Sequence, residues 1–393
     1  MKQRILIYLS AALTAASCHQ DDFVVDCEPF QQYINVCAKA GVETEGPDSK
    51  VDVSGLSLTW NANDEIGIFA GPNNFNRRFT LKDGAGSHNA TFTGELLPTN
   101  GRQTLIAYYP YDSNLTDPSD WHLDYEGQTY NGNFSESGTG TDIEHYLYMA
   151  TFPTDGFQIE TGSGWPSGYT LNFNRHLSSI VRFKISNDMS SDIVIDKIQL
   201  YSPMSPFYDL YADLPGSRII WYWNDIIGVS LDSPLTMRAN NASGNKYVHM
   251  AASRSNFGNG TDLEVRIFGT LDGQNVRMSI PKRVSSNANL TVGKRTTVNV
   301  QLNDRTSYEI ANTVDVVLSG NRLVSPEFEK SDADWQPGRI IWGDGKNEQY
   351  AGGISHQYYG SSSYTASFSC WGTSSTVKFS NLENITSIDF SNF

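Results

Sequence analysis

Charged residues, cysteines and long apolar runs are all scarce in this sequence. Asp, Glu, Lys and Arg make up 18% of the 393 residues, and there are four cysteines. So few cysteines cannot form a disulfide framework in a chain of this length. A membrane-spanning helix needs about 20 consecutive apolar residues, and no run after the N-terminal segment approaches this length. The length allows two or three domains of ordinary size.

Motifs of the common enzyme classes are missing as well. The sequence has no His-Glu-x-x-His, Gly-x-Ser-x-Gly, Walker or Cys-x-x-Cys pattern, and its seven histidines are not at metal-ligand spacing. We therefore expect no catalysis, no cofactor and no metal. Two alternatives remain open. Carboxylates of a hydrolase would come together only in the fold, and an acidic stretch would either bind calcium or lie in solvent. That stretch contains Glu327, Glu329, Asp332 and Asp334.

The N-terminal segment has the pattern of a secretory signal with a lipoprotein cleavage box. Lys2 and Arg4 precede a short apolar run, which ends in small residues followed by Cys18. This pattern predicts a signal peptide over 1–18 and acylation of Cys18. The alternative is an ordinary signal peptide, with Cys18 in a disulfide. Asp21 and Asp22 follow; they resemble the surface-export signal of Bacteroides-group lipoproteins, or form a solvated tether.

The formal net charge of −15 bears on the partners of the chain. Removing Lys2 and Arg4 with the signal would take it to −17. A field of that sign repels nucleic-acid backbones and anionic lipid. We expect no nucleic-acid partner, and an outer-membrane, cell-surface location through the N-terminal lipid alone.

The other three cysteines are Cys27, Cys37 and Cys370. Cys27 and Cys37 are close enough in sequence to bridge in an oxidising compartment, which the sequence leaves open. Cys370 lies in an alternating run and is predicted to be a small buried side chain.

Short alternating apolar segments separated by Gly, Asn, Asp and Pro recur along the chain, which is typical of β-sandwiches. We predict an all-β chain with a tether and lead-in at 19–45 and β units at 46–164, 165–303 and 304–393. A long polar and aromatic insertion, 112–141, interrupts the first unit and is expected to be functional or mobile.

Several aromatic residues are candidates for stacking on sugar rings. They are Trp121, Tyr125 and Tyr130 in the insertion, and Trp221 and Trp223 in a later cluster. The alternative is that these rings pack at the edges of the sandwiches.

Residues 60–69, Trp-Asn-Ala-Asn-Asp-Glu-Ile-Gly-Ile-Phe, resemble the signature of the fimbrillin family, the subunits of type V pili. Two further marks follow in order: residues 107–111, which contain Tyr109 and Pro110, and the strand-bend-strand at 171–185, which contains His176. We interpret the marks as structural. Trp60 is expected in the core, Asp64 in a turn that its carboxylate caps, Gly67 in the following strand, and His176 in a structural role. Of Tyr108 and Tyr109, one ring should point inward and one outward.

The resemblance implies two tandem transthyretin-like β-sandwiches and polymerisation by β-strand exchange. In the family, removal of a leading strand opens a groove for the next subunit, and an arginine-specific protease opens major pilins. Here no arginine occurs between Cys18 and Asn76. The expectation is therefore an uncleaved accessory, tip or anchor subunit.

The last unit carries marks similar to those of PKD-like sandwiches: Gly343-Asp344-Gly345, His356-Gln357-Tyr358 and Tyr364-Thr365. We expect a third, small Ig/PKD-like β-sandwich there. The predicted function is non-catalytic adhesion at the cell surface, in or beside a pilus, with other subunits or a host or bacterial surface ligand as partners. The alternative is a stand-alone glycan-binding lipoprotein of the outer membrane.

Overall fold

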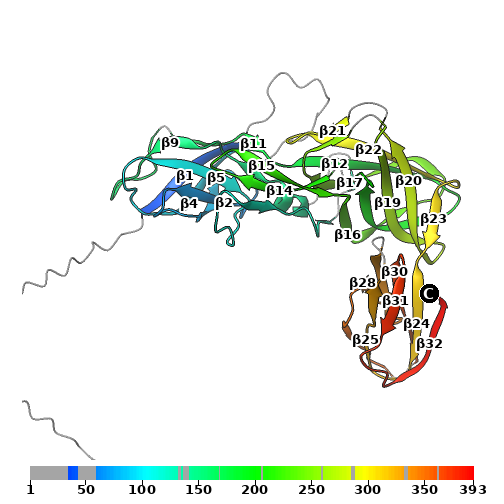
Figure 1. Cartoon of the computed structure of the whole chain (residues 1–393). Coiled ribbons are helices and arrows are strands. Elements are labelled where there is room, and N and C mark those ends of the chain that lie inside the picture. The colour runs from blue at the N-terminus through cyan, green and yellow to red at the C-terminus, as the bar shows by residue number, and fades with distance from the viewer. Residues whose placement is uncertain are drawn as a thin grey trace, which may run out of the picture.

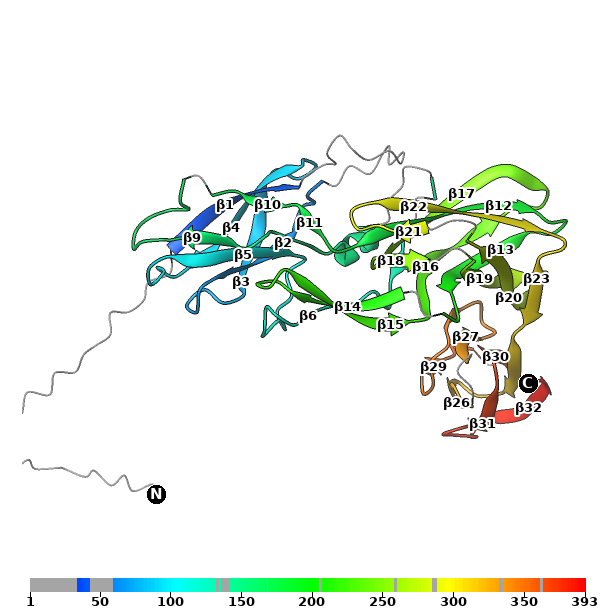
Figure 2. The same cartoon turned by 45° about the horizontal axis from the view of Figure 1, so that its top comes forward.

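The computed structural model describes residues 34–42, 59–131, 134–135, 141–167, 169–204, 207–257, 260–284, 288–331, 335–360 and 363–393. Within these ranges the chain is made of strands and one short 3-10 helix, η1 (Thr141–Tyr146), so the prediction of an all-β chain is confirmed. No described helix is long and apolar enough to cross a membrane. The first and second units lie end to end, and the third turns away beside the second (Figures 1 and 2).

One large sheet forms the first unit, in the order β10-β1-β4-β3-β2-β5-β8-β11, with β9 paired to β5. Its strands are β1 (Ile34–Val42), β2 (Glu65–Ala70), β3 (Arg77–Asp83), β4 (Asn89–Leu96), β5 (Gln103–Tyr109), β8 (Met149–Ala150), β9 (Thr154–Phe157), β10 (Leu171–Phe173) and β11 (Arg175–His176). Because β10 and β11 belong to this sheet, the first unit extends past the boundary expected at 164.

Strand β1 lies inside the first sheet, between β4 and β10. It is antiparallel to β4, from Ile34 opposite Leu96 to Gly41 opposite Asn89, and parallel to β10 over its last three residues. The segment expected as a tether therefore contains a sheet strand. Its apolar residues at 34, 36, 38, 40 and 42 alternate as a strand requires.

Both faces of the first sheet are covered at β5. Tyr109 lies in the core on one face and Tyr108 in the core on the other, and they are 6% and 0% exposed. The second face is covered by the insertion and by a hairpin of the second unit, and residues of both lie in its core. The expectation that one tyrosine points outward is therefore wrong, because this face is shared with the second unit.

Two sheets enclose the core of the second unit. One contains β17 (Asn241–Ala252), β12 (Ser179–Asp188) and β22 (Arg295–Asn303); the other runs β23 (Ser307–Ile310), β20 (Gln274–Arg283), β19 (Asp262–Leu271), β13 (Ile193–Tyr201), β16 (Ile226–Met237) and β7 (Thr129–Tyr130). Smaller sheets pair β6 (Trp121–Leu123) and β15 (Arg218–Asn224) with β14 (Phe207–Asp213), and β18 (Ser255–Phe257) with β21 (Ala288–Leu290). The insertion thus gives β6 and β7 to the sheets of the second unit.

The third unit follows the second after one residue. Ala311 separates β23 from the next strand, and its N–H donates to the carbonyl of Asn275, 2.9 Å away. The main sheet runs β28 (Asn347–Gln349), β27 (Gln336–Ile341), β30 (Tyr364–Trp371), β24 (Asn312–Leu318) and β32 (Ile385–Asn392). Two pairs complete it: β25 (Arg322–Val324) with β29 (Ser355–Gln357), and β26 (Glu327–Lys330) with β31 (Ser374–Lys378). Cys370 is buried in its core.

His249 on β17 is buried in the second unit, 1% exposed, and neither ring nitrogen has a hydrogen-bond partner among the described residues. Burial, assisted by the charges of Arg295 and Arg182, lowers its pKa to about 4. At a pH below about 6.5, the usual pKa of histidine, His249 is protonated in the unfolded chain. In the folded chain it stays neutral until the pH approaches 4. We expect the free energy of unfolding to fall by about 2–3 kcal/mol between about pH 7 and 4.5.

Urea unfolding at both pH values tests this prediction. His249→Leu should remove that part of the pH dependence. If the free energy of unfolding of the variant falls by the same amount between the two pH values, a group other than His249 causes the acid sensitivity.

Candidate functional site

Three of the family-motif residues meet at one corner of the first unit. Trp60 is 1% exposed, and its ring makes edge contacts with Phe92 at 4.9 Å, Phe173 at 5.3 Å and Tyr109 at 5.5 Å between centroids. The carboxylate of Asp64 accepts the N–H of Asn61 at 2.7 Å and the hydroxyl of Tyr109 at 3.1 Å. Both oxygens of the Asp64 carboxylate accept hydrogen bonds from protein groups, so we assign the corner a structural role.

The remaining motif residues are Gly67, Pro110 and His176. Gly67 faces Tyr108 across β2 and β5, and a Cβ at Gly67 would lie 1.9 Å from a ring carbon of Tyr108. The glycine is therefore needed to seat this ring. Pro110 directly follows Tyr109, whose ring contacts Trp60 at this corner. His176 lies on β11 opposite Met149 and is not part of the corner.

The expected sugar-stacking rings are in the core. Trp121, Tyr125 and Tyr130 are 1%, 4% and 0% exposed, because the insertion packs against the first sheet and the second unit. Their burial argues against sugar stacking and agrees with the alternative, in which these rings pack against the sandwiches. Trp221 and Trp223 belong to β15, but their side chains fall outside the described part of the chain.

Other predicted sites also lie partly beyond the description. Cys18, Cys27, Asp332 and Asp334 fall outside the described residues, as does the side chain of Cys37. The described part of the acidic stretch includes Glu329, which pairs with Lys378 at 3.3 Å. In the ranges that the structure covers, no three His, Cys, Asp or Glu side chains are placed to hold a metal.

The marks of the third unit form one cluster. The ring of His356 stacks on Trp342 at 4.5 Å, and its Nε2 lies 2.9 Å from the carboxylate of Asp344, whose pKa this bond lowers. The hydroxyl of Tyr358 donates to the carbonyl of Trp342 at 2.9 Å, and its ring stacks on Tyr364 at 4.4 Å. These contacts fix the turn at 343–345 to the main sheet and are structural.

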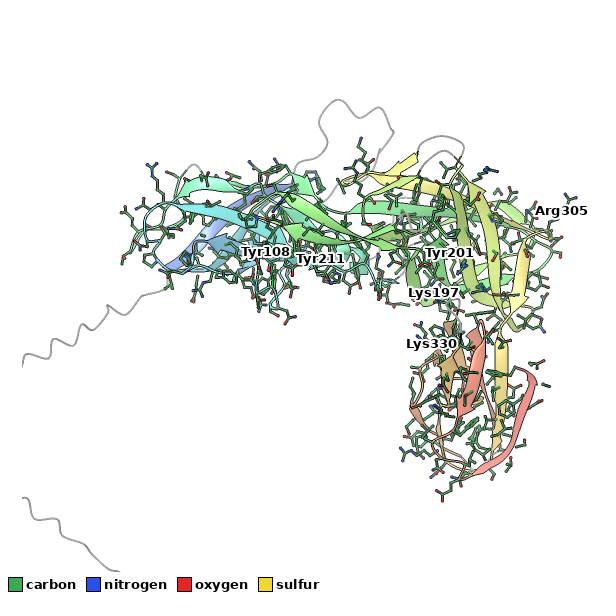
Figure 3. The ribbon with its side chains drawn as sticks, viewed as in Figure 1. Tyr108, Lys197, Tyr201, Tyr211, Arg305 and Lys330 are labelled. Carbon is green, nitrogen blue, oxygen red and sulfur yellow. The ribbon has the colours of Figure 1, made fainter. Side chains whose placement is uncertain are left out.

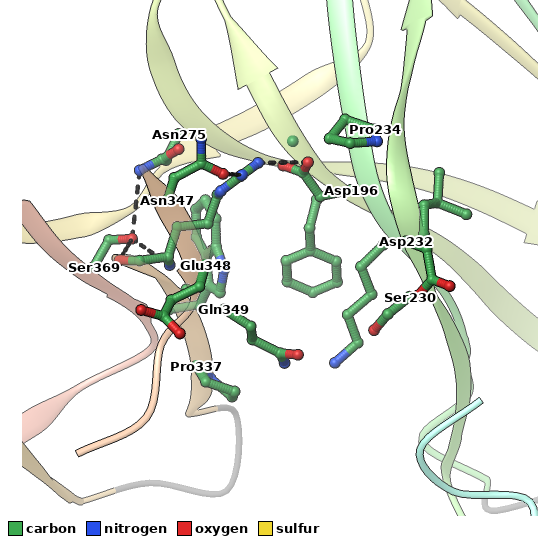
Figure 4. Close-up of a pocket in the computed structure, with 17 residues that line it drawn as sticks. Asp196, Ser230, Asp232, Pro234, Asn275, Pro337, Asn347, Glu348, Gln349 and Ser369 are labelled. Carbon is green, nitrogen blue, oxygen red and sulfur yellow. Dashed lines mark hydrogen bonds and ion pairs between the residues drawn. The ribbon is translucent and has the colours of Figure 1, made fainter. Parts of the chain in front are cut away.

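Two neighbouring cavities lie at the joint between the second and third units. One cavity of about 220 Å³ and a neighbouring one of about 390 Å³ share Lys197, Ser230 and Gln349 among their lining residues. The first lies between β13, β16 and β19 on one side and β27, β28 and β30 on the other (Figure 4). The second extends toward residues 125–129 of the insertion.

One ion pair crosses this joint. The guanidinium of Arg339 on β27 lies 2.5 Å from the carboxylate of Asp196 on β13 (Figure 4). Burial raises the pKa of Asp196, and Arg339 opposes that rise. Phe268 and Trp371 pack beside it, with ring centroids 5.6 Å apart. The pair and the rings link the two units while leaving the cavities open between them.

Lys197 stands next to Asp196 and also lines the cavities. Successive side chains of a regular strand point to opposite faces, but the pairing of β13 shifts between Ile195 and Lys197 on both sides. This bulge brings both charged side chains to one cavity. Sequence reasoning missed this site, although adjacent Asp196 and Lys197 inside an apolar strand pattern were its signal.

No protein-family model matches the chain, and no curated protein matches it in sequence. Among solved structures, it is similar to a candidate cell adhesion protein from Bacteroides ovatus, with 15% identity over 71% of this chain and 96% of that chain, at a TM-score of 0.42. A candidate cell adhesion protein from Bacteroides uniformis gives 12% identity, coverage of 70% and 98%, and a TM-score of 0.38. The tip fimbrial protein Mfa3 from Porphyromonas gingivalis, truncated at its C-terminus, is 11% identical over 71% of this chain and 99% of that chain, at a TM-score of 0.30. Because these TM-scores are below 0.5, the similarities assign no family.

Proposed function

We propose that the chain is a non-catalytic, surface-exposed lipoprotein adhesin: a fimbrillin-like accessory, tip or anchor subunit of a type V pilus. The observation that carries the proposal is the place of β1. This N-terminal strand pairs with β4 over eight register positions and with β10 over three. A leading strand in that place fills the groove that a neighbouring subunit's strand would otherwise occupy.

The sequence around β1 supports an uncleaved subunit. No arginine occurs between Cys18 and Asn76, so an arginine-specific protease has no site between the lipid and β3 at which to release β1. The third unit adds a further domain after the second sandwich, which suits a terminal or display role. Partners would be other pilus subunits or a surface ligand, and the N-terminal lipid would hold the chain in the outer membrane.

The anchor has a direct test in Cys18→Ala. We expect the variant to lose nearly all incorporation of labelled palmitate, because a thioether-linked lipid needs this thiol. Cys27→Ala is the matched control and should label like the unchanged chain. A Cys18→Ala variant that stays labelled would contradict lipid anchoring at this residue.

The stand-alone glycan-binding alternative gains its support from the joint cavities. They offer polar side chains and two aromatic rings in a hollow between two units, which is the usual setting of a small-molecule site.

A further inference from the structure

Lys197 lies where the second unit meets the third (Figure 3). Asp232 and Glu348 line the same cavity, but Lys197 has no ion-pair partner among the described residues. It is half-buried, and its ammonium lies 5.7 Å from the centroid of the Phe268 ring. Asp196, its neighbour, is occupied by Arg339. Burial lowers the pKa of Lys197. A partly desolvated ammonium without a paired carboxylate costs stability, so a ligand carboxylate placed beside Lys197 would be stabilised there.

Two acceptors at the joint also lack donors. Gln199 is 4% exposed, and its Oε1 has no partner among the described residues. Its Nε2 makes a long contact of 3.4 Å to Gln336 across the joint. The second carboxylate oxygen of Asp196 is buried and unpaired in the same part of the chain. Buried acceptors of this kind are normally satisfied, so the ligand should carry hydroxyl or amine donors.

The rest of the lining is polar. It includes the carboxylates of Asp232, Glu348 and Glu126, which can accept hydrogen bonds from sugar hydroxyls, and a group of carboxamides. Asn275, Gln336, Asn347 and Gln349 line one or both cavities. A carboxamide both donates and accepts, as a sugar hydroxyl does. Phe268 and Trp371 pack edge to face and close the apolar end of the first cavity.

We propose that this joint site, made of Asp196, Lys197, Gln199, Phe268, Gln349 and Trp371, binds a carboxylate-bearing sugar such as a uronic acid. The sugar carboxylate pairs with Lys197, and its hydroxyls donate to Gln199 and Asp196. The inference rests on the proposed adhesin function and gives the chemistry of its ligand. A peptide with a free C-terminal carboxylate also offers an anion, but it lacks the several hydroxyls with which a sugar can both donate to and accept from the carboxamides.

Calorimetric titration of the detergent-solubilised mature protein tests this inference. Sodium glucuronate should bind saturably, and glucose, which lacks the carboxylate, at least about tenfold more weakly. Lys197→Met keeps the apolar stem and should weaken glucuronate binding at least about tenfold. Lys282→Met is the matched control: Lys282 is a second partly buried lysine with a lowered pKa that lines neither cavity, and its variant should bind unchanged.

A melting curve separates a ligand-binding role of Lys197 from a structural one. If the unpaired ammonium destabilises the free protein, the Lys197→Met variant should melt at the same temperature or higher. Absence of saturation by about 10 mM glucuronate, equal binding of glucose, tighter binding of N-acetylphenylalanine, or unchanged affinity in Lys197→Met would overturn the inference. Binding lost together with a lowered melting temperature would also overturn it. None of these results touches surface anchoring, which the Cys18 labelling experiment tests on cells.

Discussion

A chain that begins at Val51 is expected to lose the monomeric state that a chain beginning at Ile34 keeps. Without β1, eight register positions of β4 and three of β10 lose their partner. At a net value of about 0.5–1.5 kcal/mol for each backbone hydrogen bond, the loss is about 5 kcal/mol or more. An open sheet edge of this length also pairs with other chains. Size-exclusion chromatography at equal concentrations of the two chains checks the result.

The control for this truncation is the strand itself. A nine-residue peptide of sequence 34–42, added under reducing conditions because it contains Cys37, should return the shorter chain to a monomer. A peptide with the same composition in scrambled order should not. If the chain from Val51 remains a monomer with an unchanged melting temperature, β1 does not fill the groove of the first sheet.

Replacing Trp60 with alanine should produce the largest loss of stability from a single substitution. The ring is fully buried and contacts three other aromatic rings at one corner of the first unit. Truncating a buried tryptophan removes its transfer free energy and leaves a cavity, which together cost about 3–5 kcal/mol. Urea unfolding followed by fluorescence and by circular dichroism measures the change for the first unit.

Trp60→Phe distinguishes packing from hydrogen bonding at this corner. The indole Nε1 has no partner among the described residues, so phenylalanine gives up ring volume but no hydrogen bond. We expect it to cost less than half as much as alanine. Equal losses for the two variants would mean that a polar contact of the indole, and not its packing, stabilises the corner.

The strand content and the motif corner follow from local sequence, because alternation and turn residues act over a few positions. Trp60 and Asp64 stand in the core and in a capped turn, as their neighbours in the sequence indicate. Tyr108 is different. Its position predicts that it faces away from Tyr109, but its burial depends on a hairpin of the second unit more than 90 residues away. Local pattern gives the face, and tertiary contact decides whether that face is covered.

The same distinction explains the insertion and the joint. Trp121, Tyr125 and Tyr130 are polar-flanked aromatics, and sequence alone cannot tell a loop over solvent from a loop between two units. The joint site needs β13 of the second unit and β27, β28 and β30 of the third, which are separated by well over 100 residues. Its local trace is Asp196 followed by Lys197 in an otherwise apolar strand.

The central claim, an uncleaved surface lipoprotein whose leading strand stays in its own sheet, is tested most directly by the mature N-terminus. Native cells are sheared, and this protein is followed by mass spectrometry in the sheared and membrane fractions. We expect a chain that begins at acylated Cys18 and retains Ile34–Val42 in whichever of these fractions it appears. A surface protein that begins after Val42 would instead show that β1 is removed.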